Sequence, residues 1–142
     1  MSGSGGDELF AGYPWRYYKS SNSQDFEEFI DSYYLYWQRL IDNKDIKNLL
    51  KPIWNDVKDV WTRDIFRNVF FDHEIALDTS TDYINHSLYF EAKTFLHGLL
   101  VVEDKLSMAH SLETRVPFLD NDLVDFAMRC PVSLKLNNLS DV

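Results

Sequence analysis

The sequence predicts an all-α fold. Apolar residues recur at helical spacing in several separate segments, whereas no set of segments shows the every-second-residue alternation of paired strands. Capping residues and prolines stand where these apolar patterns begin and end. The chain is 45% hydrophobic, which argues against a disordered protein and provides apolar surface for helices to bury.

The first half of the chain is expected to form three helices. Residues 25–41 form the first, and Asp42 and Asn43 suit the turn that follows it. Residues 45–51 form a short helix that Pro52 stops, because proline cannot continue a helical hydrogen-bond ladder. A third helix is predicted by apolar residues at helical spacing, namely Val57, Val60, Trp61, Ile65, Val69 and Phe70.

The second half is expected to form a long helical segment. Thr79 with Asp82 resembles a capping box that opens it. Apolar residues then lie on one side of the helix, namely Ile84, Leu88, Ala92, Phe95 and Leu96. Gly98 interrupts this pattern, which resumes over residues 99–111.

A turn and a last helix should complete the chain. Residues 114–119 should be extended, because Pro117 biases the residue before it away from the helical region. Asp120 or Asn121 can cap the last helix, which should end before Pro131.

The composition excludes several classes of protein. A formal net charge of −9 disfavours binding to the phosphate backbone of nucleic acids. No apolar run approaches the roughly 20 residues that a membrane-spanning helix needs, and the first residues do not resemble a secretory signal. The single cysteine, Cys130, excludes an internal disulfide and a cysteine-clustered metal site. We therefore expect a cytoplasmic protein that binds neither nucleic acid nor membrane.

The glycine-rich start, residues 2–6, is the first candidate site, and we call it the glycine turn. Glycines allow positive φ angles and let a ligand approach the backbone closely. Asp7 and Glu8 should follow in the first turn of a helix, where negative charge is favourable. An acidic side chain beside exposed amides also suits a magnesium ion that carries phosphates. A flexible linker or an ordinary helix-capping turn would explain the same glycines.

Residues 103–120, which we call the downstream block, are the second candidate site. Lys105 and the acids at positions 103 and 104 would share one end of a helix. Glu113 and Arg115 are two residues apart where the chain leaves that helix, so both could project into one cleft. An arginine beside a glutamate can orient a carboxylate or phosphate ligand. A surface charge pair joining a helix to a turn is the simpler alternative.

Both sites carry a family resemblance. The opening SGSGGDELFAGY and the later DKLSMAHSLETRVPFLDNDLVDFAM together resemble the synthetase domain of the glutamine-dependent asparagine synthetases. Both motifs are long, and they occur in the expected order and at a suitable separation. The resemblance disfavours a linker at the glycine turn. It implies that residues 1–142 are the helical part of an α/β domain of the adenine-nucleotide α-hydrolase-like, or ATP pyrophosphatase, type.

The resemblance also implies what lies outside these residues. The family's SGGxDS pyrophosphate loop should precede residue 1, and a C-terminal part of the domain should follow residue 142. Without the sheet, the 142 residues should be inactive and should expose apolar surface, so we expect either self-association into a homo-oligomer or partial instability.

The implied activity is that of an ATP-dependent carbon–nitrogen ligase. In that family, ATP with Mg²⁺ converts the side-chain carboxylate of aspartate to an adenylate, and ammonia from a separate glutaminase domain then gives asparagine. The resemblance places residues at the nucleotide or adenylate (Ser2, Gly3, Gly5 and Gly6), at the metal (Asp7), and in the catalytic cleft (Ser4, Lys105, Glu113 and Arg115).

Ser4 departs from the family pattern. Asparagine synthetases often carry glutamate at this position, where it handles a proton during the attack of ammonia, and serine is a poor base at neutral pH. A related amide-forming ligase with another carboxylate substrate or another base is therefore an alternative. A non-catalytic helical interaction module that retains the motifs is the alternative outside the enzymes.

Overall fold

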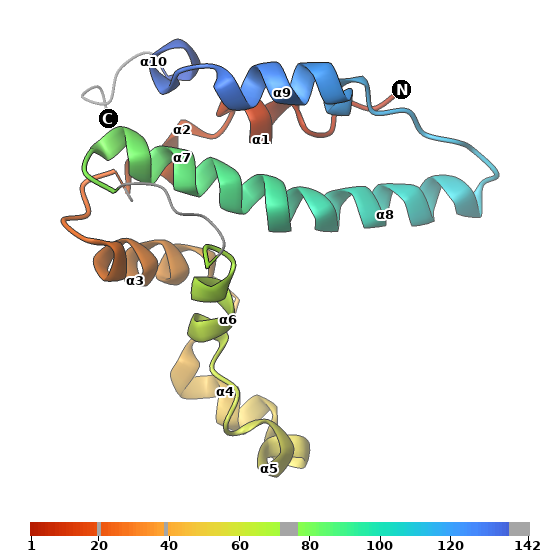
Figure 1. The fold of residues 1–142 in the computed structure, drawn as a ribbon. Coiled ribbons are helices and arrows are strands. Elements are labelled where there is room, and N and C mark those ends of the chain that lie inside the picture. Colours follow the sequence, from red (N-terminus) through yellow and green to blue (C-terminus); the bar gives the residue numbers. More distant parts are fainter. Residues whose placement is uncertain (20, 39, 72–76, 137–142) are drawn as a thin grey trace.

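The computed structural model describes residues 1–19, 21–38, 40–71 and 77–136, and within these ranges every regular element is helical (Figure 1). The elements are, in chain order, α1 (Gly6–Phe10), α2 (Pro14–Tyr18), α3 (Phe26–Trp37), α4 (Asn43–Leu49), the 3₁₀ turn η1 (Lys51–Ile53), α5 (Trp54–Val57), α6 (Thr62–Asn68), α7 (Ser80–Phe90), the π-helical turn η2 (Glu91–Phe95), α8 (Leu96–Ala109), the 3₁₀ turn η3 (Pro117–Leu119), α9 (Asn121–Arg129) and α10 (Val132–Lys135). The prediction of an all-α chain is confirmed.

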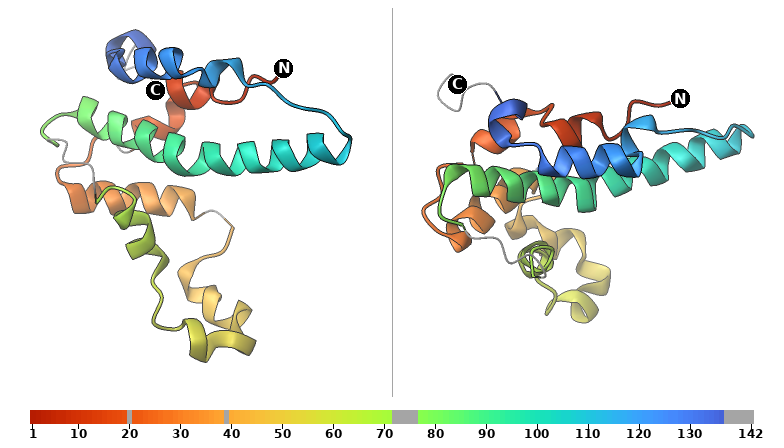
Figure 2. Two further views of the ribbon diagram at one scale, coloured as in Figure 1. Left: turned by 45° about the vertical axis from the view of Figure 1, so that its right-hand side comes forward. Right: turned by 45° about the horizontal axis from the view of Figure 1, so that its top comes forward.

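A long rod made of α7, η2 and α8 organises the molecule. The N-terminal helices α1 and α2 lie on one side of this rod together with α9 and α10 (Figure 1). Helices α3 and α6 lie on the other side, and α4 and α5 form an arm that extends away from the rod, as both views of Figure 2 show. The two ends of the sequence therefore share one face of the rod, and the middle of the sequence occupies the other.

Several predicted helix boundaries are confirmed by their caps. The capping box of Thr79 and Asp82 is present at the start of α7, and the Asp25 side chain accepts a hydrogen bond from the Glu28 amide at the start of α3. The Asp120 side chain accepts from the amides of Asp122 and Leu123 at the start of α9. These helices begin where the side chains can satisfy amides that lack a partner in the helix.

Other boundaries differ from the prediction. The expected third helix is divided into α5 and α6, because Val60 and Trp61 lie between them and are exposed. Gly98 does not interrupt the rod but lies exposed within α8. The predicted extension of residues 114–119 is wrong over η3, because proline is readily accepted at the first position of a helical turn. Helix α10 was not predicted; it forms where Val132 and Leu136 are buried against α7.

Helix α7 is buried on two sides. On one side it joins an aromatic cluster with α3 and α6, in which the Phe66 and Phe90 rings lie 4.5 Å apart between centroids and the His86 ring stacks on Phe70. On the other side Ile84 and Leu88 pack among residues of α2 and α10. A helix that is apolar on both sides is typical of the centre of a bundle.

A buried carboxylate lies where the rod passes through its π-helical turn. Glu91 is 0% exposed, and its Oε2 accepts hydrogen bonds from Arg16 Nη1 and from the Tyr17 hydroxyl, each at 3.1 Å. Its Oε1 accepts a hydrogen bond of 2.9 Å from the Tyr33 hydroxyl. Burial raises the pKa of Glu91, although these three donors favour its charged form. The carboxylate thereby joins α2 and α3, which lie on opposite sides of the rod.

None of the helices in the described ranges combines the length and apolar character that crossing a bilayer requires.

Replacing Arg16 with alanine tests how much the buried ion pair between Arg16 and Glu91 contributes to the stability of the fold. The variant leaves the Glu91 carboxylate without its counter-charge, so the free energy of unfolding near neutral pH should fall by about 3–5 kcal/mol. Arg63, whose side chain is 31% exposed and pairs with Glu27 and Asp31, provides the more solvent-accessible control, and its alanine variant should lose under about 1 kcal/mol. Urea unfolding followed by circular dichroism measures both.

The loss in free energy of unfolding caused by Arg16→Ala should also depend on pH. Because the folded-state pKa of Glu91 is raised, its contribution to stability is fully present below the unfolded-state pKa, near the ordinary value of 4.5. That contribution is lost as pH rises through the folded-state pKa. Removing Arg16 removes one cause that lowers the pKa of Glu91, so the deficit should shrink as pH falls. A deficit that is the same across this range would contradict the assignment to Glu91.

Candidate functional site

The glycine turn packs against the downstream block, and this packing restricts the residues that the turn can accept. Gly5 has a φ of 95° at the start of α1, and a Cβ at this position would lie 2.5 Å from Leu119 Cδ2. Gly6 lies against the Phe118 ring, whereas a Cβ at Gly3 would meet nothing within 4 Å. Gly5 is therefore required by backbone geometry and packing, and Gly3 leaves its surroundings open to an approaching molecule.

Asp7 and Glu8 lie in the first turn of α1, as expected. Asp7 is exposed and accepts a hydrogen bond from the Tyr13 hydroxyl, which is the main reason that the pKa of Tyr13 is raised to about 12. A Cβ at Gly12 would clash with the Asp7 carboxylate, so the glycine lets the chain fold back beside it. Asp7 is thus exposed beside Gly12, where a ligand could reach it.

Glu8 differs from its neighbour. Its sequence position predicts a role at the helix start, but its side chain is only 2% exposed. Within the described parts of the chain, Glu8 Oε1 is a buried oxygen without a hydrogen-bond partner. Helix α1 therefore has one acid on its surface and one in the interior.

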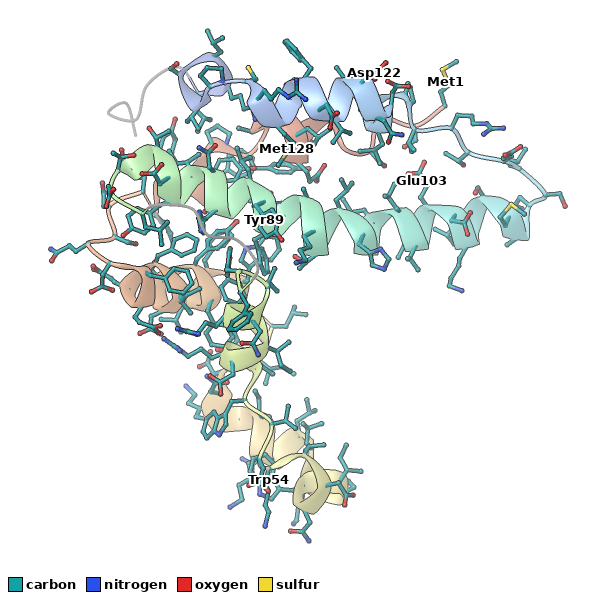
Figure 3. All side chains as sticks on the ribbon, in the orientation of Figure 1. Met1, Trp54, Tyr89, Glu103, Asp122 and Met128 are labelled. Carbon is teal, nitrogen blue, oxygen red and sulfur yellow. The ribbon has the colours of Figure 1, made fainter. Side chains whose placement is uncertain are left out.

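The structure joins the two candidate sites through Ser2 and Ser4. The Ser2 amide donates a 2.8 Å hydrogen bond to the Arg115 carbonyl. The Ser4 hydroxyl donates a 2.6 Å hydrogen bond to Glu103 Oε2, and the Ser2 and Ser4 hydroxyls lie 2.9 Å apart. Figure 3 shows Glu103 on the side of α8 that faces the N-terminal segment. The glycine turn and the downstream block are therefore parts of one site.

Glu103 is a functional candidate that the sequence analysis left out. Hydrogen bonds from the Ser2 and Ser4 hydroxyls hold the pKa of its carboxyl below its usual value. A cavity of about 260 Å³ lies beside it and is lined by Leu100, Glu103, Asp104, Thr114 and Val116. The acid at the head of the downstream block was visible in the sequence, but its pairing with a serine 99 positions away was not.

The other predicted site residues of the block lie at the surface. Arg115 and Glu113 form an ion pair at 2.9 Å, and their side chains are 75% and 71% exposed. Lys105 is exposed on α8. The pair that was expected to project into one cleft does come together, whereas its high exposure matches the alternative of a surface charge pair. The structure therefore brings Ser2, Ser4 and Glu103 together, and leaves Lys105 and the ion pair open to solvent.

The donors available to a metal ion are few. In the described ranges, no three histidine, cysteine, aspartate or glutamate side chains are grouped closely enough to hold a metal. Magnesium, however, is commonly bound by one or two carboxylates while substrate phosphates and water complete its coordination. A single exposed carboxylate such as Asp7 fits that mode, and it does not fit a metal held by protein ligands alone.

Comparison with known proteins identifies the family of the chain. The asparagine synthase family model matches residues 1–141. Asparagine synthetase [glutamine-hydrolyzing] 3 of Bacillus subtilis (strain 168) is 27% identical over 97% of this chain and 21% of its own length. Asparagine synthetase [glutamine-hydrolyzing] 1 of the same organism is 38% identical over 54% of this chain and 11% of its own length. No solved structure gives a significant match.

The fold and site define a helical segment in which a glycine turn and an acidic block meet. The family match extends over nearly all of that segment. The chain belongs to the asparagine synthase family. It spans about a fifth of the length of the first of these relatives.

Two glycine-to-alanine substitutions should have opposite effects on stability. Gly5→Ala places a side chain at positive φ and against Leu119, so the free energy of unfolding should fall by about 1–3 kcal/mol. Gly98→Ala lies in open space within α8 and should gain about 0.5–1 kcal/mol. Urea unfolding measures both changes, and a Gly5→Ala variant as stable as the unmodified chain would contradict the described turn.

The hydrogen bonds to Glu103 can be tested by titration. Replacing Ser2 and Ser4 with alanine should raise the pKa of Glu103 toward its ordinary value of 4.5, because the charged form loses its donors. The side-chain carboxyl ¹³C shift, followed by NMR against pH in glutamate-labelled protein, reports this change. Ser107→Ala is the control: its hydroxyl donates to the Asp104 carbonyl on the same helix and should leave the Glu103 titration unchanged.

Proposed function

We propose that residues 1–142 form part of the synthetase domain of an ATP-dependent ligase that converts aspartate to asparagine. The observation that carries this proposal is the contact between the glycine turn and the downstream block, through Ser2, Ser4 and Glu103. Membership of the asparagine synthase family supports the same activity. The neighbouring α/β part of the domain would provide the remaining nucleotide contacts.

The reaction has two steps. The aspartate side-chain carboxylate attacks the α-phosphorus of ATP, a new C–O–P bond forms, and pyrophosphate leaves. Ammonia, which a glutaminase domain of the whole protein would release from glutamine, then displaces AMP from the acyl carbon. Charge accumulates on phosphate oxygens in the first step, and a proton must leave nitrogen in the second. The site therefore needs both a way to stabilise anions and a proton acceptor.

The glycine turn and Asp7 are suited to the first step. Gly3 leaves open space beside the turn, so the phosphates or adenylate can approach the backbone. A magnesium ion bound with ATP would neutralise the phosphate charge, and Asp7 would hold it. Ser2, Gly5 and Gly6 maintain the turn through their contacts with the downstream block.

The exposed residues of the downstream block would act on the substrate. Lys105 can place a positive charge beside a phosphate or carboxylate, and Arg115 is oriented by its ion pair with Glu113. Their exposure leaves them free to contact a ligand or the α/β part of the domain. ATP as a substrate and a lone cysteine favour a cytoplasmic location for the reaction.

An exchange assay on the whole protein that carries this chain tests the first step. With Mg²⁺ and aspartate, the protein should incorporate labelled pyrophosphate into ATP. Asp7→Asn retains an acceptor for the Tyr13 hydroxyl but removes the charge, so exchange should fall about a hundredfold or more. Asp59→Asn, an exposed acid between α5 and α6, is the matched control and should exchange normally.

The same assay separates the alternatives. Exchange with a different carboxylate, while aspartate is inert, would identify a related amide-forming ligase instead. Failure to exchange with any carboxylate would reject the enzyme activity, and normal exchange by Asp7→Asn would reject the role of Asp7.

A further inference from the structure

Formation of an amide from ammonia requires a proton acceptor. The nitrogen lone pair forms a C–N bond to the acyl carbon, and the C–O bond to AMP breaks with its electron pair leaving on the phosphate. The nitrogen then carries a positive charge and must lose one proton to become a neutral amide. A carboxylate placed beside the nucleophile can take that proton, because the charged nitrogen of such an intermediate is strongly acidic.

Three acids lie near the glycine turn, and they differ in what they can reach. Asp7 accepts a hydrogen bond from the Tyr13 hydroxyl and is the proposed partner of magnesium. Glu8 is almost completely buried, so a soluble nucleophile has no direct access to it. Glu103 is partly exposed and lies against the turn itself. Of these three side chains, only Glu103 combines access with a position at the turn.

The surroundings of Glu103 suit a base. The Ser4 hydroxyl fixes Oε2 with a hydrogen bond of 2.6 Å, and the Ser2 hydroxyl lies beside it. The adjoining cavity of about 260 Å³ has ample room for ammonia, since a water molecule of similar size occupies about 30 Å³ in the liquid. Residues of α8 and of the segment that follows it line this cavity, so it opens beside the Glu103 side chain.

We propose that Glu103 accepts the proton that ammonia loses during amide formation, and that Ser2 and Ser4 are its positioning residues. This inference rests on the proposed function. It also explains how the site can work with serine instead of glutamate at position 4. The carboxylate comes from helix α8, and Ser4 orients it. The carboxylate of Glu103, with its pKa below the usual value of 4.5, is ionised at neutral pH. The lowering makes it a weaker base, but the positively charged nitrogen is acidic enough to give up its proton to it.

Glu103→Gln in the whole protein separates a base from a structural contact. The amide oxygen of glutamine can still accept the Ser4 hydrogen bond, but the side chain cannot take a proton. Aspartate-dependent pyrophosphate exchange should stay within about twofold of the unmodified protein, whereas kcat/KM for ammonia should fall about 10²–10⁴-fold. Asp59→Asn changes an exposed acid between α5 and α6, outside the site, and should affect neither reaction.

A relocated carboxylate provides the second measurement. Adding Ser4→Glu to Glu103→Gln returns a carboxylate to the same place from the turn, so at least about tenfold of the lost ammonia-dependent rate should be recovered. Adding Ser4→Ala instead should recover none of it.

The outcomes distinguish the two proposals. If the unmodified protein exchanges pyrophosphate but Glu103→Gln uses ammonia normally, the inference is wrong and the proposed function stands. A parallel loss of exchange and of ammonia use, with no recovery on relocation, would make Glu103 a structural residue. If the unmodified protein does not exchange with any carboxylate, the proposed function is rejected and the role of Glu103 falls with it.

Discussion

The arrangement of the helices depends on the hydrogen-bonded carboxylate of Glu91. A fully buried acid is costly unless its oxygens are satisfied, and here a guanidinium and two hydroxyls satisfy them. The donors come from α2 and α3, so the requirement fixes elements on both sides of the rod relative to its π-helical turn. Wider turns of this kind occur often at functional positions in helices. Here the wide turn also contacts α1, which carries Asp7.

The candidate site is attached to the rod close to the buried Glu91 carboxylate. Helix α1 packs against η2 on one side and α9 on the other, and its glycine turn closes over η3. The hydrogen bonds of Ser2 and Ser4 then attach the chain start to the return segment and to α8. The geometry of the site depends on these short polar contacts and on the packing of Gly5 and Gly6 against Leu119 and Phe118. Functional residues are commonly held in this way, on connecting segments that a rigid scaffold positions.

Local patterns predicted much of the fold, because their physical causes are local. The Thr79 capping box, the Asp120 cap and the apolar spacing of α3 each depend on residues within a few positions of one another. The division between α5 and α6 could not be read from spacing, since Val60 and Trp61 have the right period but are not buried. In the site, Asp7 and the glycines were found from their chemistry, and their roles stay predictions. Glu103 could not be found, because its partner is distant in sequence and no single-sequence pattern links a serine to an acid across a fold.

The hydrogen bond between Tyr13 and Asp7 has a consequence for cation choice. The pKa of Tyr13, about 12, keeps this hydroxyl protonated at physiological pH, so it remains a donor to the Asp7 carboxylate. A cation bound at Asp7 would then meet a carboxylate with one oxygen engaged, and monodentate coordination would be favoured over bidentate. Calcium often takes carboxylates in the bidentate mode, whereas magnesium prefers single oxygens in a strict octahedron. One tyrosine hydroxyl would thus favour magnesium over calcium through denticity, in addition to the difference in ionic size.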